Sequence, residues 1–248
     1  MAQTVHTAFD KIASNYDRLW STKAAGLAQR IAVWRWVDVL FSRGESVLDL
    51  GCGTGIDALH LEAAGVSVYG IDSSSKMIEV ARRRDVQAEC LPIERLEQLD
   101  RRFDGVLSNF GALNCVASLP DLAAGLARTV RPGGRLALCF LNRFCLWETA
   151  YFFLKGKPSK ALRRLRGKAE SSIGAQVFYP TARTITAAFQ PEFHLIKSCG
   201  VGFAVPPSYV AALTDWEVDK LSALDRRITH WPIIRSACDH RLYIFERV

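Results

Sequence analysis

Apolar residues recur along this chain with two different spacings. In the first forty residues they recur every three or four positions, which predicts two helices. The helical sets are Phe9, Ile12, Ala13, Tyr16 and Leu19, then Leu27, Ile31, Trp34, Val37 and Phe41. Farther along, short apolar runs alternate with helical stretches. This pattern predicts strands at 47–50, 66–72, 86–90, 103–109 and 135–142, with helices near 54–61, 75–84 and 119–130.

An alternation of strands and helices is typical of a parallel sheet covered on both faces. Segments 193–199 and 241–246 predict two more strands, separated by PPSY and a polar helix. Segment 143–190 is too long for a simple loop, so we expect it to fold over another part of the protein. With 248 residues, 49% of them hydrophobic and 23% charged, the chain fits one large globular domain.

The sequence VLDLGCGTG at 47–55 places Gly51, Gly53 and Gly55 directly after an apolar run. Glycine is used where a side chain would collide or φ is positive, so this loop predicts a ligand close to the main chain at a helix N-terminus. A dinucleotide fingerprint does not fit, because the third glycine comes one residue too early and Ile56 replaces the small residue. Asp49 would repel phosphates and suits a ligand with positive charge.

Residues 45 to 142 resemble the class I S-adenosylmethionine-dependent methyltransferases. VLDLGCGTG is similar to their first motif, whose acid, here Asp49, engages the ammonium end of the methionine moiety. Asp72 matches the acid that binds both ribose hydroxyls. QAECLPIERL resembles the adenine-binding stretch, with Gln87 in place of the usual aspartate; its amide oxygen is still an acceptor for the adenine amino group.

Two further segments extend this resemblance. RPGGRLAL at 131–138 matches the turn into the fifth strand, and FDKIASNYDRLW is similar to a segment whose tyrosine, here Tyr16, closes over the cofactor. The resemblance implies S-adenosylmethionine as cofactor and S-adenosylhomocysteine as product. The implied cofactor-binding residues are Tyr16, Asp49, Gly51, Cys52, Gly53, Gly55, Asp72, Ser73, Met77, Gln87, Ala88, Asn109 and Phe110.

The implied fold is a Rossmann-like α/β domain. We expect a seven-stranded, mostly parallel sheet with an antiparallel last strand and helices on both faces. We also expect a single domain over 1–248 with an N-terminal helical lid at 1–43, an inserted cap at 143–190 and a second acceptor-side elaboration at 203–238.

Methyl transfer from a sulfonium is an in-line displacement that depends chiefly on alignment and requires no metal. A base is needed only if the nucleophile arrives protonated. Because the antiparallel last strand begins at the ligand side, His240 is the candidate base, with Asp239 as orienting partner. The alternative is a surface histidine at a strand start. We expect Asn114, Asn142, Arg143 and Tyr209 on the acceptor side.

The residues after the fourth strand, SNFGALNC, lack the adjacent prolines and the stacking tyrosine of enzymes that methylate nucleic-acid amines. We therefore expect methyl transfer to the oxygen, nitrogen or carbon of a small-molecule or lipid-like acceptor. The alternatives are an RNA methyltransferase, or a catalytically inactive cofactor-binding regulator.

The net charge of +7 is unevenly placed, because seven cations crowd into residues 155–168. They are Lys155, Lys157, Lys160, Arg163, Arg164, Arg166 and Lys168. Three interpretations are a solvated helix face, a patch for an anionic acceptor, and a peripheral contact with an anionic membrane, in which Arg163, Arg164 and Arg166 touch lipid. RNA is the least favoured partner, because no separate RNA-binding module is visible.

The cysteines indicate the compartment. Seven cysteines without a CxxC pair suggest reduced thiols and neither a disulfide framework nor a zinc site. The N-terminus shows no signal-peptide pattern, and no stretch is apolar enough to span a bilayer. We expect a cytoplasmic protein.

Overall fold

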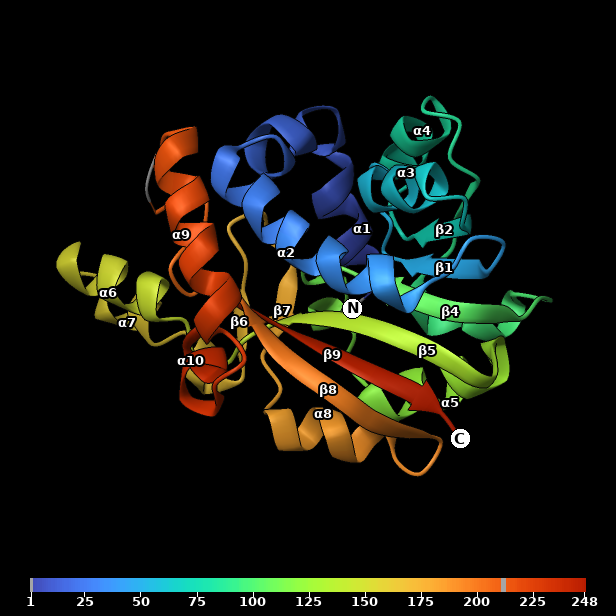
Figure 1. The fold of residues 1–248 in the computed structure, drawn as a ribbon. Coiled ribbons are helices and arrows are strands. Elements are labelled where there is room, and N and C mark those ends of the chain that lie inside the picture. The colour runs from blue at the N-terminus through green and yellow to red at the C-terminus, as the bar shows by residue number, and fades with distance from the viewer. Residues whose placement is uncertain (1, 211–212) are drawn as a thin grey trace.

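The computed structural model describes residues 2–210 and 213–248. In this part of the chain, seven strands form one twisted sheet in the order β3-β2-β1-β4-β5-β9-β8 (Figure 1). β9 runs antiparallel to both of its neighbours, and the pairs among β1 to β5 are parallel. The strands are β1 Ser46–Leu50, β2 Ser67–Asp72, β3 Ala88–Cys90, β4 Phe103–Ser108, β5 Val130–Leu141, β8 Phe193–Val201 and β9 His240–Arg247. The predicted sheet and its antiparallel last strand are confirmed.

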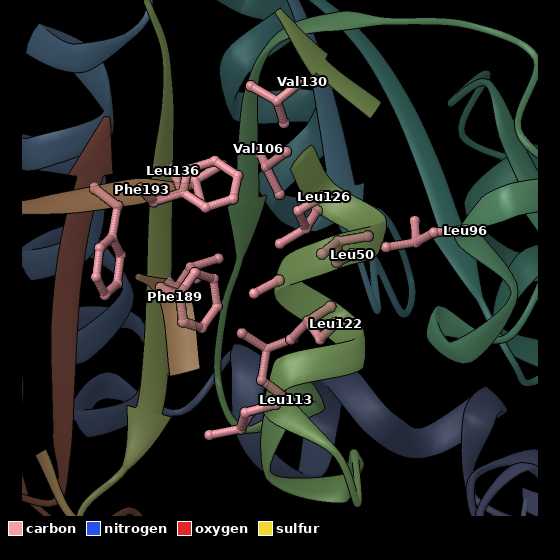
Figure 2. Close-up of a cluster of buried hydrophobic side chains, with 14 of the residues drawn as sticks. Leu50, Leu96, Val106, Leu113, Leu122, Leu126, Val130, Leu136, Phe189 and Phe193 are labelled. Atoms are coloured by element: carbon pink, nitrogen blue, oxygen red, sulfur yellow. The ribbon is translucent and has the colours of Figure 1, made fainter. Parts of the chain in front are cut away.

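Helices cover both faces of the sheet, and each face has its own buried apolar cluster. On one face lie α2 (Ala24–Leu40), α3 (Ile56–Ala63) and α4 (Ser75–Arg82). On the other lie α5 (Leu119–Thr129), α8 (Ala182–Phe189) and the 3-10 segment η3 (Ile93–Gln98). Figure 2 shows Leu122 and Leu126 of α5 pointing toward Leu50 and Val106 of the sheet. Strands buried on both faces explain the nearly continuous apolar runs of the sequence.

The helix expected from about residue 54 begins at Ile56. The reason is Gly55, whose φ of +81° is left-handed and therefore cannot continue a helix. Side chains also cap later helices: for example, the Ser74 hydroxyl accepts from Met77 N at 3.1 Å, and the Ser118 hydroxyl accepts from Asp121 N at 3.4 Å.

The first predicted helix is split. α1 (Ala2–Asp10) is followed by two short helical segments, η1 (Ala13–Asn15) and η2 (Asp17–Ser21). Two carboxylates tie this region to the sheet side. Asp10 accepts from the Ser74 hydroxyl at 2.6 Å, and Asp17 accepts from the Thr54 hydroxyl at 2.7 Å and from Arg84 at 2.6 Å. These local anchors compete with one continuous helix.

Segment 143–190 does fold into structure of its own. It contains α6 (Leu146–Leu154), α7 (Pro158–Ala161), the turn η5 (Arg164–Arg166), and the hairpin strands β6 (Lys168–Glu170) and β7 (Gln176–Phe178), followed by α8. Figure 1 shows α6 and α7 at one side of the molecule, away from the sheet. α9 (Asp215–Ile228) and α10 (Pro232–Ala237) lie between β8 and β9 in sequence. The two-stranded β6–β7 hairpin was not predicted.

A buried ionic network joins this segment to the start of β9. Glu148 of α6, 1% exposed, accepts from Arg163 at 2.8 Å and from Arg164 at 2.7 Å. Arg164 also donates to the Asp239 carboxylate at 2.8 Å. Burial opposes ionisation of Glu148, but the charges and hydrogen bonds of the two arginines outweigh it and lower its pKa to about 2.

This network corrects the interpretation of the basic segment. Arg164 is 5% exposed, and Arg163 pairs with the same carboxylate, so neither guanidinium is free to touch lipid. The physical reason is the buried Glu148, which requires cationic partners inside the protein. Of the three arginines predicted to contact a membrane, only Arg166 is exposed.

We expect Glu148→Gln to lower the free energy of unfolding by roughly 3–5 kcal/mol at pH 7, because it leaves Arg164 buried with one carboxylate fewer. Since the folded pKa of Glu148 lies below its ordinary value of 4.5, its contribution is present above pH 4.5 and is lost as pH falls toward 2. Urea unfolding at several pH values measures both effects. Glu97→Gln, on an exposed turn, is the matched control; an equal loss in both variants would contradict a role for the network.

Candidate active site

A pocket of about 160 Å³ lies at the carboxyl ends of the parallel strands. The predicted cofactor residues that line it are Tyr16, Gly51, Gly53, Asp72, Ser73, Met77, Asn109 and Phe110. Among the described residues, the lining does not include Asp49, Cys52, Gly55, Gln87 or Ala88. The position agrees with the rule that ligands of open parallel sheets bind outside the carboxyl ends of the strands.

The three glycines of the loop have different tasks. A Cβ on Gly51 would lie 2.3 Å from the Cβ of Ala112, and one on Gly55 would lie 3.0 Å from Val86, so both allow close packing. Gly53 has a φ of +54° and no atom within 4 Å of a Cβ position, and it lines the pocket. Its main chain is therefore open to a ligand, as the sequence predicts.

Asp72 sits at the end of β2 with its carboxylate held in place by the main chain. It accepts from Gly53 N at 3.0 Å and from Ser74 N at 2.8 Å. Burial raises its pKa above the ordinary value, while these two hydrogen bonds act in the opposite direction. A carboxylate oxygen has two lone pairs, so the side chain can accept two more hydrogen bonds from the pocket side.

Asp49 lies beneath the loop and is 2% exposed. Its Oδ2 has no hydrogen-bond partner within the described chain. Burial, and then the neighbouring charge of Asp57, raise its pKa well above the ordinary value, although Arg30 opposes the shift. Arg30 itself pairs with Asp57. A positively charged ligand group would supply the partner that this oxygen lacks.

These residues fit S-adenosylmethionine. The unpartnered oxygen of Asp49 suits the ammonium group, the open main chain at Gly53 allows close approach, and Asp72 suits the ribose hydroxyls. Gln87, by contrast, is exposed, and Gly70 N donates to its main-chain carbonyl at 2.8 Å. The structure does not bring its side chain to the pocket, because Pro92, Ile93 and Glu94 form that wall.

The N-terminal segment covers the pocket. Tyr16 lines it and packs against Trp20 and Phe9, with ring centroids 5.0 and 6.5 Å apart. The Asp17 carboxylate reaches into the glycine loop through the hydroxyl of Thr54. The N-terminal segment is thus attached to the glycine loop, and its role as a lid stays a prediction.

Phe110 occupies a strained main-chain position in the pocket wall. Its φ of +49° is uncommon for an aromatic residue, and the Asn109 side chain accepts from its N–H at 3.0 Å. The Arg30 guanidinium lies 4.8 Å from the ring centroid, and His240 meets the ring edge-on at 5.1 Å. Such positions persist only where the surroundings impose them, and they cluster at functional sites.

His240 lies where the sequence predicts, opposite Leu141 at the end of β5. It is 7% exposed and contacts Phe110, but it is absent from the lining of the pocket as described. Its Nδ1 lies 3.4 Å from Asp239 Oδ2, without a hydrogen bond. Burial lowers the pKa of His240 below its ordinary value; Asp239 opposes this shift and Arg164 adds to it. The imidazole is therefore neutral at pH 7.

The four predicted acceptor-side residues have internal partners, and none of them is among the described lining residues. The Asn114 side chain donates to Phe178 O at 2.7 Å and accepts from Leu141 N at 2.8 Å. Asn142 donates to Cys238 O at 3.0 Å, Arg143 donates to Leu165 O at 2.9 Å, and Tyr209 donates to Glu148. Of the four, only Asn114 bonds to a lining residue, Phe178, and the other three join segments outside the lining.

Several lining residues were not predicted. They are Val5, His6, Phe9, Pro92, Ile93, Glu94, Gly111, Ala112, Cys115, Val116, Ala117, Gln176 and Phe178. Some follow directly from motifs that were recognised, such as Pro92 and Ile93 after the adenine-binding stretch. Gln176 and Phe178 come from β7, and no sequence signal connects that strand with the pocket.

Within the described chain, no three histidine, cysteine or carboxylate side chains are grouped so as to hold a metal ion. Across the same residues, no helix has the length and apolar character to cross a membrane.

Comparisons with known proteins agree with this geometry. Residues 47–134 match a family described as a methyltransferase domain. A demethylmenaquinone methyltransferase of Symbiobacterium thermophilum is 35% identical over 145 residues, which cover 54% of this chain and 57% of that protein. The chain thus spans a little over half the length of this curated relative.

Two solved structures share the fold over nearly the whole chain. The CcbJ methyltransferase from Streptomyces caelestis has a TM-score of 0.65 at 17% identity and covers 98% of each chain. An S-adenosylmethionine-dependent methyltransferase from Mesorhizobium loti has a TM-score of 0.62 at 18% identity and covers 92% of this chain and 99% of its own. At these identities the likeness shows the fold alone.

We expect Asp72→Ala to weaken S-adenosylmethionine binding by about 1.5–3 kcal/mol, the range for hydrogen bonds to a charged group. Isothermal titration calorimetry measures this loss. Asp72→Asn, which keeps one acceptor oxygen, should lose less, and exposed Asp100→Ala should lose nothing. Unchanged affinity in a folded Asp72→Ala variant would remove this carboxylate from the cofactor site.

Proposed function

We propose that the protein is a class I methyltransferase that transfers a methyl group from S-adenosylmethionine to a small-molecule or lipid-like acceptor, and the match of residues 47–134 to a methyltransferase domain supports this. One observation carries the proposal: the Asp72 carboxylate and the open main chain of Gly53 line a single pocket. Asp49, at the end of β1 before the glycine loop, adds a buried carboxylate oxygen without a hydrogen-bond partner.

Each of these residues has a binding task. Asp72 accepts hydrogen bonds from the ribose hydroxyls, Asp49 balances the ammonium charge, and the main chain at Gly53 allows close contact. Tyr16 closes the pocket from the lid side. When bound, S-adenosylmethionine supplies an activated methyl group, so the protein chiefly has to align the acceptor and exclude water.

The character of the pocket wall supports an apolar acceptor. Phe9, Phe110, Val116 and Phe178 supply aromatic and aliphatic surface. Beyond the residues assigned to the cofactor, the lining adds the polar side chains His6, Glu94 and Gln176. Pockets of this type take small molecules that are largely apolar with a few oriented polar groups. The relative named for demethylmenaquinone points to the same class of acceptor. Neither observation distinguishes oxygen, nitrogen and carbon nucleophiles.

The cysteines support a reducing compartment, in which we place the protein. All seven are free. Burial raises the pKa of Cys115 to about 11 and that of Cys145 to about 12, so both remain thiols at neutral pH. Thiols of this kind are typical of cytoplasmic proteins.

The proposal is tested by incubating the protein with methyl-labelled S-adenosylmethionine and a cell extract. We expect label in an organic-extractable small molecule, and none with Asp72→Ala at cofactor concentrations that saturate only the parent protein. Label in the RNA fraction would instead favour an RNA methyltransferase. Cofactor binding without transfer to any fraction would favour a catalytically inactive regulator.

We further propose His240 as the base for an acceptor that arrives protonated. Its imidazole is neutral, which is the form that accepts a proton. It reaches the pocket only past Phe110, so a shift of that ring has to accompany proton transfer. The Asp239 carboxylate lies beside the imidazole and opposes the lowering of the His240 pKa by burial.

If His240 is the base, His240→Asn should lower turnover by about 100-fold while cofactor affinity stays the same. Because its folded pKa is lowered, the parent should keep its turnover down to below about pH 6.5 and lose it only as the imidazole becomes protonated. The variant should lack this acidic limb. The control is His194→Asn, at an exposed position on β8. Turnover of His240→Asn within a few-fold of the parent would contradict the role as base and would leave alignment of the acceptor as the main cause of the rate acceleration.

A further inference from the structure

The α6–α7 hairpin ends in a fully exposed tip, residues 153–160. Its sequence, FLKGKPSK, combines two large apolar residues with three lysines. Leu154 is 89% exposed and Phe153 is 49% exposed. Burying a leucine side chain fully would gain about 1.5–3 kcal/mol, and here Phe153 stands exposed directly beside it. The tip therefore carries apolar surface that the rest of the described chain does not cover.

The charges around the tip have one sign. No aspartate or glutamate occurs between Glu148 and Glu170. Glu148 is buried and fully engaged at the root of the hairpin, together with Arg163 and Arg164. The cations that remain exposed are Lys155, Lys157, Lys160, Arg166 and Lys168. The surface is cationic at the tip and along the return to β6.

The base of the hairpin is fixed by several contacts, which give the exposed tip a defined position on the surface. The ionic network fixes α6 and η5 to Asp239 at the start of β9. The Trp147 indole donates to Phe203 O at 2.7 Å. In Figure 1, α6 and α7 lie at the margin of the molecule, beyond α9 and α10. The tip can thus meet a broad flat surface without obstruction by the sheet.

We propose that residues 153–160 dock on an anionic lipid bilayer, with Phe153 and Leu154 entering the interface and the lysines contacting lipid headgroups. Peripheral binding of useful strength needs two signals, and this tip has both apolar area and clustered cations. A nucleic acid would explain the lysines and could stack a base on Phe153, but it does not explain the more exposed Leu154, which has no face for base stacking. Vesicle binding requires neither cofactor nor acceptor, so this inference goes beyond the proposed methyl transfer.

The tip that we propose to dock is connected through the chain to the wall of the pocket. The chain that leaves the hairpin continues through β6 to β7, where Gln176 and Phe178 line the pocket. The Asn114 side chain fixes β7 through the Phe178 carbonyl. One segment therefore supplies both the exposed tip and part of the wall around the acceptor position.

Flotation with vesicles of phosphatidylcholine alone, and with added phosphatidylserine, tests the docking. We expect binding only to the anionic vesicles, weaker at physiological than at low salt, because charge pairing at a surface is screened within about 8 Å. The triple variant Lys155→Gln, Lys157→Gln and Lys160→Gln should lower affinity on the order of 100-fold. Leu154→Ser should lower it by roughly tenfold.

Matched variants elsewhere serve as controls. The set Arg43→Gln, Arg102→Gln and Arg128→Gln removes three exposed cations, and Val39→Ser removes an aliphatic side chain that is 76% exposed. Both should bind vesicles like the parent, and thermal unfolding verifies the fold of every variant. No binding of the parent at low salt overturns the proposal. Vesicle binding that stays unchanged in Leu154→Ser also overturns it. So does a parent protein that binds RNA but not vesicles, with the RNA binding lost in the triple lysine variant.

Discussion

The carboxylate of Asp72 joins the parts of the molecule on which the site depends. It accepts from the main chain of Gly53 in the glycine loop and from that of Ser74 at the start of α4. The Ser74 hydroxyl in turn donates to Asp10 of α1. Loop, sheet, helix and lid thus converge on one strand end. A ligand that binds Asp72 meets a group whose orientation is already fixed, which lowers the entropy that binding costs.

A second group of charges fixes the segment that follows β5. Arg164 lies between Glu148 and Asp239, so the insertion after β5 is held to the start of β9. A buried network of this kind is weak evidence for net stability, but removal of one member leaves an uncompensated charge. Its effect here is positional: it sets the hairpin at one end and constrains the surroundings of His240 at the other.

The sequence predicted those features that local physics decides. The alternating apolar runs predicted the strands within a few residues, and the residues Gly51, Gly53 and Asp72, which the motifs singled out, line the pocket. Five residues predicted to face the pocket do not line it: Gln87, Asn114, Asn142, Arg143 and Tyr209. The positions of such side chains depend on contacts with residues distant in sequence, as for Asn114 and Asn142. For the same reason the pattern of cations did not reveal that Arg164 is buried while its neighbour Leu165 is 44% exposed.

The division between matched and unmatched segments bears on specificity. The glycine loop, Asp72 and Phe110 all lie within residues 47–134, which match the methyltransferase domain. Val5, His6, Phe9, Tyr16, Gln176 and Phe178 lie outside it, yet they line the same pocket. The pocket is therefore lined both by the segment that matches the methyltransferase domain and by segments before and after it. Because an acceptor has to fit against the whole lining, we expect the N-terminal segment and β7 to contribute to the choice of acceptor alongside the matched segment.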